Sequence, residues 1–338
     1  MPERLVDRNP VVPADQLVAG MVPPPMFDHV SFESYIPDPK EPTQAQAVAK
    51  AAEFAGRLPK IRAGGKRGFF GKKTPSTGAG LYLDGGFGVG KTHLLASIFH
   101  SAPAPKSFGT FVELTHVVGA LGFTKAVDEL STHSVLCIDE FELDDPGDTM
   151  LVSRLLSELS AKGVSIVATS NTLPGQLGEG RFAAQDFMRE IKKLGSIFDA
   201  IRVDGPDYRH RDLPPAPEPM TDAELVERAE EVPGSTLDDF DELCAHLSTL
   251  HPSRYGKLVD GVKAVFIRNV HPVQDQAVAL RFVVFADRLY DASIPVAVSG
   301  AKLDQIFTQE MLDGGYRKKY LRATSRLLAL SRFQVATG

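Results

Sequence analysis

A glycine-rich run that ends in Lys91 and Thr92 carries the clearest chemical signal in the sequence. Its spacing is G-x-x-x-x-G-K-T. With the residue that follows, we assign this run to nucleotide binding: Gly85, Gly86, Phe87, Gly88, Val89, Gly90, Lys91, Thr92 and His93. Glycines let successive backbone N–H groups converge on a phosphate, because no Cβ stands in the way. Lys91 would reach the β- and γ-phosphates, and the Thr92 hydroxyl would bind Mg²⁺. The run therefore predicts a site for a nucleoside triphosphate and Mg²⁺.

The sequence around this run places it at a turn between a strand and a helix. Apolar residues 81–83 precede it, and a helix-like stretch, residues 92–99, follows it. The start of that helix would add the positive end of its dipole to the phosphate site. A glycine-rich turn that binds nothing is the alternative interpretation, but it does not account for the whole pattern in this context.

Two acids follow a second apolar run and are candidates for the metal and water chemistry. Residues 135–138 are typical of a strand buried on both faces, and Asp139 and Glu140 follow directly. Ligands bind at the carboxyl ends of strands in open α/β sheets. Asp139 is expected to hold Mg²⁺ directly or through water, and Glu140 to act as the base or orienter for the attacking water. Many buried strands end in an acid, so this pair gains its meaning from the glycine-rich run.

An asparagine and an arginine complete the expected catalytic set. Asn171 follows the apolar run 165–169 and would hold the attacking water against the γ-phosphate, although asparagine is also a common turn residue. Arg181 lies beyond it, where an arginine can serve a neighbouring subunit's nucleotide and raise the rate by about 10³–10⁵-fold. Arg189 is a rival for that role, and a solvent-exposed surface arginine is the alternative.

The strands and helices that alternate from residue 80 to about residue 205 predict a parallel sheet with right-handed crossovers. Residues 108–114 form a further apolar run, followed by a helical stretch to Leu130, and residues 200–203 form the last run. The predicted fold class is α/β: a P-loop NTPase core with a parallel sheet sandwiched by helices, and a smaller C-terminal α+β or helical domain.

Prolines divide the chain into three expected parts. Four prolines in residues 212–219 break the alternation and mark a boundary. We expect a proline-rich N-terminal arm, helix and basic glycine-rich loop in 1–79, the P-loop core in 80–211, and a lid-like domain in 212–338. Aromatic residues of the arm would pack beside a bound base or against any other surface of the core.

Local signals predict elements on either side of the core. A helix in the first part is expected to begin with Thr43 as its N-cap and to end near Gly56. In the last part, residues 264–267 and 278–285 are alternating runs. Residues 320–330 are expected to form a helix on which Arg322 and Arg326 share a face; these arginines would be solvated or would close over the phosphates from the lid side.

Composition limits the class of protein. The 338 residues carry a net charge of −6, which argues against extensive nucleic-acid binding but leaves room for a local basic patch. The most basic stretch, residues 60–73, would hold single-stranded nucleic acid or an acidic protein tail, or form a solvated loop. Two distant cysteines, with no bilayer-spanning run and no apolar signal core, favour a reduced cytoplasmic protein.

Several motifs together resemble one family. The glycine-rich run, the Cys-Ile-Asp-Glu-Phe strand end, residues 207–211 (Asp-Tyr-Arg-His-Arg), residues 285–291 and residues 322–327 are similar to those of the ZapE cell-division ATPases, relatives of a mitochondrial AAA-type ATPase. The resemblance covers most of residues 22–332. It implies an AAA-type fold and ATP as the nucleotide.

The resemblance also implies roles for particular residues. By motif it carries over Gly90, Lys91 and Thr92 as the phosphate and Mg²⁺ site, Asp139 and Glu140 as the metal and water site, and Asn171 as the polar sensor. Arg181 matches the arginine after that sensor, although the Leu-Pro expected after Arg181-Phe182 is missing. Arg326 or Arg322 matches the lid-side arginine.

Family membership would imply a cytoplasmic ATPase at the division site that assembles with nucleotide and uses ATP turnover to destabilise polymers of FtsZ. Our leading hypothesis is such an ATP hydrolase, with FtsZ or another protein as client, a nucleotide-dependent homo-oligomer, no membrane span and no nucleic acid. The alternatives are an ATP-dependent nucleic-acid-loading switch and an ATP-gated chaperone or scaffold.

Overall fold

The computed structural model describes residues 2–63, 77–143, 146–173, 177, 192, 195–206 and 216–332. Contacts divide the chain into two units, which we treat separately. Residues 13–23 and 27–208 make up the core unit, and residues 1–12, 24–26 and 209–338 make up the C-terminal unit. Short 3₁₀ helices are η1 (Leu5–Asp7), η2 (Pro25–Phe27), η5 (Pro252–Arg254) and η6 (Leu303–Gln305).

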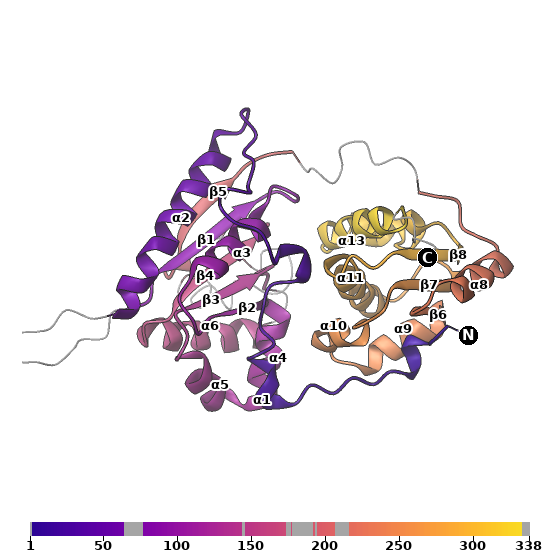
Figure 1. Cartoon of the computed structure of the whole chain (residues 1–338), viewed down its shortest axis with the longest axis horizontal. Helices are drawn as coiled ribbons and strands as arrows, with labels where there is room; N and C mark the ends of the chain where they lie inside the picture. The colour runs from indigo at the N-terminus through magenta and orange to yellow at the C-terminus, as the bar shows by residue number, and fades with distance from the viewer. Residues whose placement is uncertain are drawn as a thin grey trace, which may run out of the picture. The chain divides into compact units, whose positions relative to one another are not determined.

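The core unit is built on a five-stranded sheet of parallel strands in the order β2-β3-β4-β1-β5 (Figure 1). The strands are β1 (Gly80–Gly85), β2 (Ser107–Thr110), β3 (Val135–Asp139), β4 (Ser165–Ser170) and β5 (Asp199–Val203). In this order β4 lies between the strand of the glycine-rich run and the strand of the two acids. The end of β4 is therefore held between them, which confirms the predicted parallel α/β fold.

Helices cover both faces of this sheet. The helices of the core unit are α1 (Ala14–Leu17), α2 (Pro42–Ala63), α3 (Lys91–Ser101), α4 (Phe111–Leu121), α5 (Phe123–Leu130) and α6 (Pro146–Ala161). Leu81 and Leu83 of β1 pack into a buried cluster with α2 and α3, whereas Tyr82, between them, packs into a second cluster with α4, α5 and α6. This alternation follows from the two-residue period of a strand.

Three sequence predictions for the core unit are corrected. The run 108–114 is a strand only to Thr110, where the Thr110 hydroxyl accepts the Glu113 N–H and the Glu113 carboxylate accepts the Thr110 N–H, forming a capping box that begins α4. The helix expected to end near Gly56 continues as α2 to Ala63, because buried Phe54 and Leu58 keep its apolar face on the core. The prediction that Thr43 is the N-cap is wrong: Thr43 is the second residue of α2, and its hydroxyl accepts the Asp204 N–H.

The C-terminal unit has its own parallel sheet, in the order β6-β7-β8. Its strands are β6 (Ser235–Asp239), β7 (Ala264–Val270) and β8 (Val296–Gly300). Its helices are α8 (Asp222–Glu231), α9 (Phe240–Thr249), α10 (Tyr255–Leu258), α11 (Gln276–Asp291), α12 (Gln309–Asp313) and α13 (Arg317–Leu330). Single bridges cover both sheet edges: Glu3 pairs with Thr236 of β6, and Met220 pairs with Ser299 of β8.

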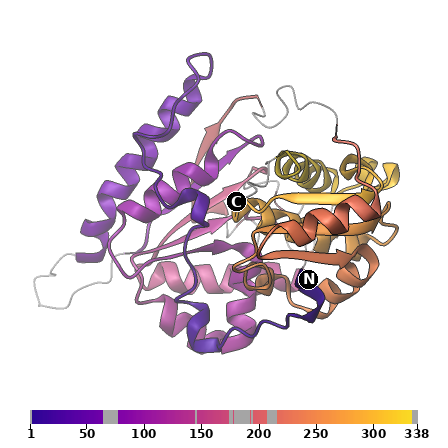
Figure 2. The same cartoon turned by 45° about the vertical axis from the view of Figure 1, so that its right-hand side comes forward.

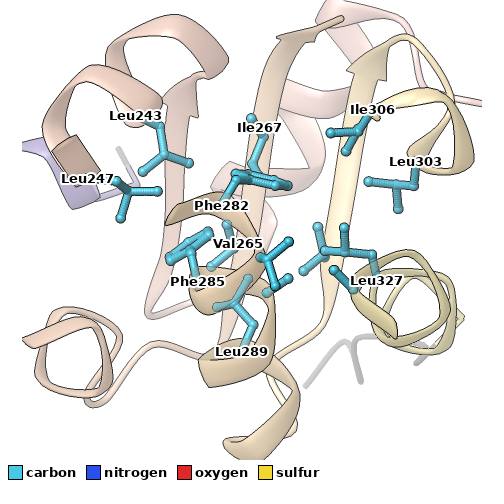
Figure 3. Packing of buried hydrophobic residues seen from close by; sticks show 14 of the residues in the cluster. Leu243, Leu247, Val265, Ile267, Phe282, Phe285, Leu289, Leu303, Ile306 and Leu327 are labelled. Atoms are coloured by element: carbon cyan, nitrogen blue, oxygen red, sulfur yellow. The ribbon is translucent and has the colours of Figure 1, made fainter. Parts of the chain in front are cut away.

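The hydrophobic core of this unit lies between the sheet and α9, α11 and α13 (Figure 3). Phe282 and Phe285 of α11 meet Val265 and Ile267 of β7 there. α8 covers the opposite face of the sheet (Figure 2), and Phe266 of β7 is in the buried cluster with Leu225 and Ala229 of α8. The run 278–285 is thus part of a helix, because apolar residues at helical spacing face one core and Asp275 caps the first turn through the Val278 N–H.

Two general findings concern cysteines and membranes. Cys137 and Cys244 are both buried and free. In the described part of the chain, no helix combines the length and the apolar character needed to cross a bilayer.

Candidate nucleotide-binding site

The glycine-rich run forms the turn between β1 and α3, as predicted. Gly88 and Gly90 adopt left-handed φ angles of 70° and 86°, which side chains rarely allow. A Cβ on Gly90 would lie 2.4 Å from Cε2 of Tyr35, and one on Gly85 would lie 2.1 Å from the carbonyl oxygen of Val203. Any larger residue would therefore deform the turn, which ends at the N-terminus of α3 where backbone N–H groups and the helix dipole favour an anion.

Lys91 is the first residue of α3 and its side chain is held within the turn. Its residue exposure is only 9%. The ammonium group donates to the carbonyl oxygens of Gly85 (3.0 Å) and Gly86 (2.5 Å) and to Oδ1 of Asn171 (3.0 Å). The structure thus brings together two predicted catalytic residues, one from α3 and one from the loop after β4.

Thr92 and Asp139, the two predicted magnesium ligands, also meet. The Thr92 hydroxyl donates to the Asp139 carboxylate at 3.1 Å (Oδ2) and 3.2 Å (Oδ1). Asp139 additionally accepts a 2.5 Å hydrogen bond at Oδ1 from the hydroxyl of Thr169 on β4. A carboxylate and a hydroxyl side by side are oxygen donors of the kind that Mg²⁺ prefers, and such sites commonly use few protein ligands together with substrate phosphates.

Within the ranges that the structure describes, no group of three or more His, Cys, Asp or Glu side chains could hold a metal ion.

Glu140 follows β3 in an unusual backbone conformation. Its φ angle is +54°, in the left-handed region that costs a residue other than glycine on the order of 1–3 kcal/mol. Such strain gathers at active sites, where the surrounding structure enforces it. The Glu140 N–H donates to the Thr169 hydroxyl at 3.1 Å, which helps to hold this turn. The side chain is half-buried, and its role as the base stays a prediction.

Glu142 is a residue that sequence reasoning did not assign to the site. It is buried, with 7% exposure, and its Oε1 accepts a 3.5 Å hydrogen bond from Nδ2 of Asn171. Asn171 thus contacts Lys91 through its oxygen and Glu142 through its nitrogen. The signal that could have found Glu142 is its two-residue spacing from Glu140 at a buried strand end.

The N-terminal arm packs against the turn and against α3. The Tyr35 hydroxyl donates to the carbonyl oxygen of Val89 at 2.6 Å. His93 Nε2 lies 2.9 Å from the carbonyl oxygen of Ser31 and 3.0 Å from the Ser34 hydroxyl, and its ring meets that of Tyr35 edge-on at 5.5 Å. In this structure His93 therefore holds the arm, and its predicted contact with the nucleotide is untested.

Arg322 and Arg326 both contact one acid in the C-terminal unit. Asp287 of α11, 4% exposed, accepts from Arg322 Nη2 at 2.6 Å and pairs with Arg326 Nη1. Burial raises the pKa of Asp287, but the two guanidinium groups outweigh it and leave this pKa below its ordinary value. The lid-side contact predicted for one of these arginines stays a prediction.

Other expected site residues lie outside the described residues. These are Arg181, Arg189 and residues 207–211, together with residues 64–73 of the basic stretch. Their assigned roles therefore remain expectations from the sequence.

Comparison with known proteins finds a family model that matches most of the chain. A family model described as AFG1-like ATPase matches residues 11–223 and 215–337. The cell division protein ZapE of Escherichia coli K12 is 34% identical over 154 residues, which cover 42% of this chain and 40% of that protein. Lactation elevated protein 1 homolog B of Danio rerio is 28% identical over 231 residues, or 57% of this chain and 45% of that protein. The chain thus matches less than half the length of these relatives.

Solved structures give a weaker likeness. Domain III of the replication initiation protein DnaA from Thermotoga maritima has 21% identity and a TM-score of 0.37, over 52% of this chain and 68% of that chain.

Proposed function

The chain belongs to the AFG1-like ATPase family, and from that premise we propose that it hydrolyses ATP to ADP and phosphate with Mg²⁺. One observation carries the proposal: polar side chains from the start of α3, the end of β3 and the loop after β4 converge, with Lys91 3.0 Å from Asn171 and Thr92 3.1 Å from Asp139. A triphosphate bound by the glycine-rich turn would lie against all of these groups.

Each group at this site has a separate role in the proposed hydrolysis of ATP. Backbone N–H groups of the turn and the ammonium of Lys91 would bind the phosphates and stabilise the negative charge that shifts during transfer. Bound Mg²⁺ would neutralise phosphate oxygens, with Thr92 and Asp139 as the residues that hold it. Glu140 would take a proton from the attacking water, and Asn171 would align that water. Arg181 of a neighbouring subunit would complete the site.

The protein on which the ATPase acts is proposed from the similarity of the chain to its relatives. Because the chain resembles a cell division protein over part of its length, we propose a cytoplasmic role at the division site. ATP turnover in a nucleotide-dependent homo-oligomer would move the C-terminal unit and so destabilise a protein polymer such as FtsZ. Sedimentation of polymerised FtsZ with this chain and ATP, ADP or no nucleotide tests this step: loss of polymer from the pellet with ATP alone is expected.

The hydrolytic step has a direct test. Glu140→Gln keeps the shape of the side chain but removes the base, so it should bind a fluorescent ATP analogue as the parent does and release phosphate at least about 10²-fold more slowly. Glu129→Gln, an exposed position on α5, is the matched control and should behave as the parent. Parental phosphate release by Glu140→Gln would falsify the assigned mechanism.

A further inference from the structure

Thr169 of β4 makes three hydrogen bonds to the segment that ends β3. Its hydroxyl donates to Oδ1 of Asp139 at 2.5 Å and accepts the Glu140 N–H at 3.1 Å. Its carbonyl oxygen accepts the Phe141 N–H at 2.7 Å. The side chain is buried, with 2% residue exposure, so these contacts are shielded from water. A single residue therefore holds three successive residues of the acidic segment.

The conformation of that segment depends on such a restraint. The left-handed turn at Glu140 redirects the chain directly after Asp139. A strained backbone persists only where neighbouring contacts enforce it. Both N–H groups that follow Asp139 are bound to Thr169, and Asp139 itself is bound by the same hydroxyl. The direction of the Asp139 carboxylate and the path of Glu140 are thus set together.

Thr169 and Asn171 have different partners although they lie two residues apart. Asn171 contacts Lys91 and Glu142, on the phosphate side of the site. Thr169 contacts the residue that meets the Thr92 hydroxyl. Asn171 is therefore placed to act on the phosphate and water, and Thr169 on the expected metal ligand Asp139.

We propose that Thr169 is a positioning residue that fixes the Asp139 carboxylate for Mg²⁺ and the Glu140 backbone for water activation. The proposal rests on the proposed ATP hydrolysis for its second part. Groups that orient metal ligands commonly change metal affinity or activity by 10–100-fold when they are removed. Thr169 does not touch the nucleotide in this role. It acts through Asp139 and Glu140.

Two variants separate the hydroxyl from the rest of the side chain. Thr169→Val keeps the branched shape and removes the hydroxyl, and Thr169→Ser keeps the hydroxyl. The affinity of the whole chain for a fluorescent ADP analogue is measured with Mg²⁺ and with EDTA, and phosphate release is measured beside it. For Thr169→Val we expect the gain in affinity from Mg²⁺ to fall by about 10-fold or more and kcat by about 10–100-fold, with unchanged affinity in EDTA. Thr169→Ser should restore most of both.

Ser165→Ala is the matched control on the same strand. The Ser165 hydroxyl accepts the Ala79 N–H at the opposite end of β4, far from the acids along the strand. Its loss should leave the Mg²⁺-dependent gain in affinity as in the parent.

The outcomes separate a positioning role of Thr169 from a structural role and from failure of the proposed hydrolysis. Equal loss of affinity in Mg²⁺ and in EDTA for Thr169→Val would reduce Thr169 to a structural residue, and parental behaviour of that variant would overturn the proposal. If the parent releases no phosphate but Thr169→Val still loses the Mg²⁺-dependent gain, hydrolysis is wrong and the positioning of Asp139 stands. A parent chain that binds no ADP overturns both.

Discussion

Each unit buries a group of charged side chains, but the two groups are built in opposite ways. In the C-terminal unit, Asp287 is paired with Arg322 and Arg326, so its negative charge meets positive charge within the protein. In the core unit, Lys91 donates to carbonyl and amide oxygens, and Asp139 accepts from two hydroxyls. Hydrogen bonds to such neutral groups can be exchanged for phosphate oxygens or a metal ion. Burial of charge alone therefore does not identify a binding site, and the partners of the buried charge have to be considered as well.

The largest effect is expected from breaking the charge balance of the C-terminal unit. Asp287→Ala removes the carboxylate that pairs with the buried Arg322 and the half-buried Arg326, which should lower the free energy of unfolding by about 3–5 kcal/mol. Urea unfolding measures this loss. Because the pKa of Asp287 is lowered, its contribution is present above the unfolded pKa of about 3.9 and is lost as pH falls through the folded value.

A substitution of Arg326 tests whether the cluster around Asp287 is structural and separate from nucleotide binding. Arg326→Ala should destabilise the C-terminal unit and leave the affinity for ATP at the parental level in the folded protein. If ATP affinity instead fell 10-fold with stability intact, Arg326 would be the lid-side arginine expected from the sequence, and the contrast between the two clusters would fail.

In the core unit the expected effect falls on ligand binding rather than on folding. Lys91→Ala removes the ammonium that would meet the phosphates and should reduce kcat/KM by about 10²–10³-fold. It should change the free energy of unfolding by about 1 kcal/mol, since water that enters the space can bind the carbonyl oxygens of Gly85 and Gly86 and Oδ1 of Asn171. Phosphate release measures the change in kcat/KM, and urea unfolding measures the change in the free energy of unfolding. Lys125→Ala, at an exposed position on α5, is the matched control.

The sequence predicted most of the core unit because its signals are local. Apolar runs gave β1, β3, β4 and β5, and the glycine-rich run, which supplied Lys91 and Thr92, required a strand before it and a helix after it. Since parallel strands share one carboxyl edge, residues that end different strands could be brought together without knowing their order.

Other features depend on neighbours that are distant in the chain. Thr169 and Glu142 were missed because their importance lies in contacts with β3 and with Asn171, and neither residue type stands out in an apolar run. Residues 278–285 have the sequence pattern of an alternating run, because valine and phenylalanine favour strands. The Asp275 cap and the core contacts make them part of the helix 276–291, so packing overrides local preference in this segment.

A smaller effect is expected at Glu142. Glu142→Ala removes the acceptor of the Asn171 amide and should lower kcat by about 10-fold, because Asn171 loses one of the two contacts that orient it. Glu142→Gln keeps an acceptor oxygen and should lie nearer to the parent. Equal kcat for Glu142→Ala and the parent would exclude Glu142 from the site and leave Lys91 as the contact that orients Asn171.

The smallest effect concerns an exposed pair in the C-terminal unit, which extends the comparison to the surface. The hydrogen bond from His271 to Asp241 raises the pKa of His271, and the bond to the Pro272 carbonyl adds to it. A raised pKa means that the pair stabilises the fold fully below the unfolded value of about 6.5 and that the contribution disappears as pH rises through the folded value. Because His271 is 51% and Asp241 77% exposed, the contribution should be only about 0.3 kcal/mol.

Asp241→Asn isolates the contribution of the His271–Asp241 charge pair, because it keeps the contact of the His271 ring with Phe240. Urea unfolding of the parent and of Asp241→Asn at pH 5.5 and pH 8 should show a difference in stability at the lower pH that shrinks at the higher one. A difference that stays constant would mean that Asp241 acts on the N-terminus of α9 and not on His271. A difference of several kcal/mol would mean that exposure does not weaken this pair relative to the buried cluster at Asp287, so burial would not explain the large effect expected there.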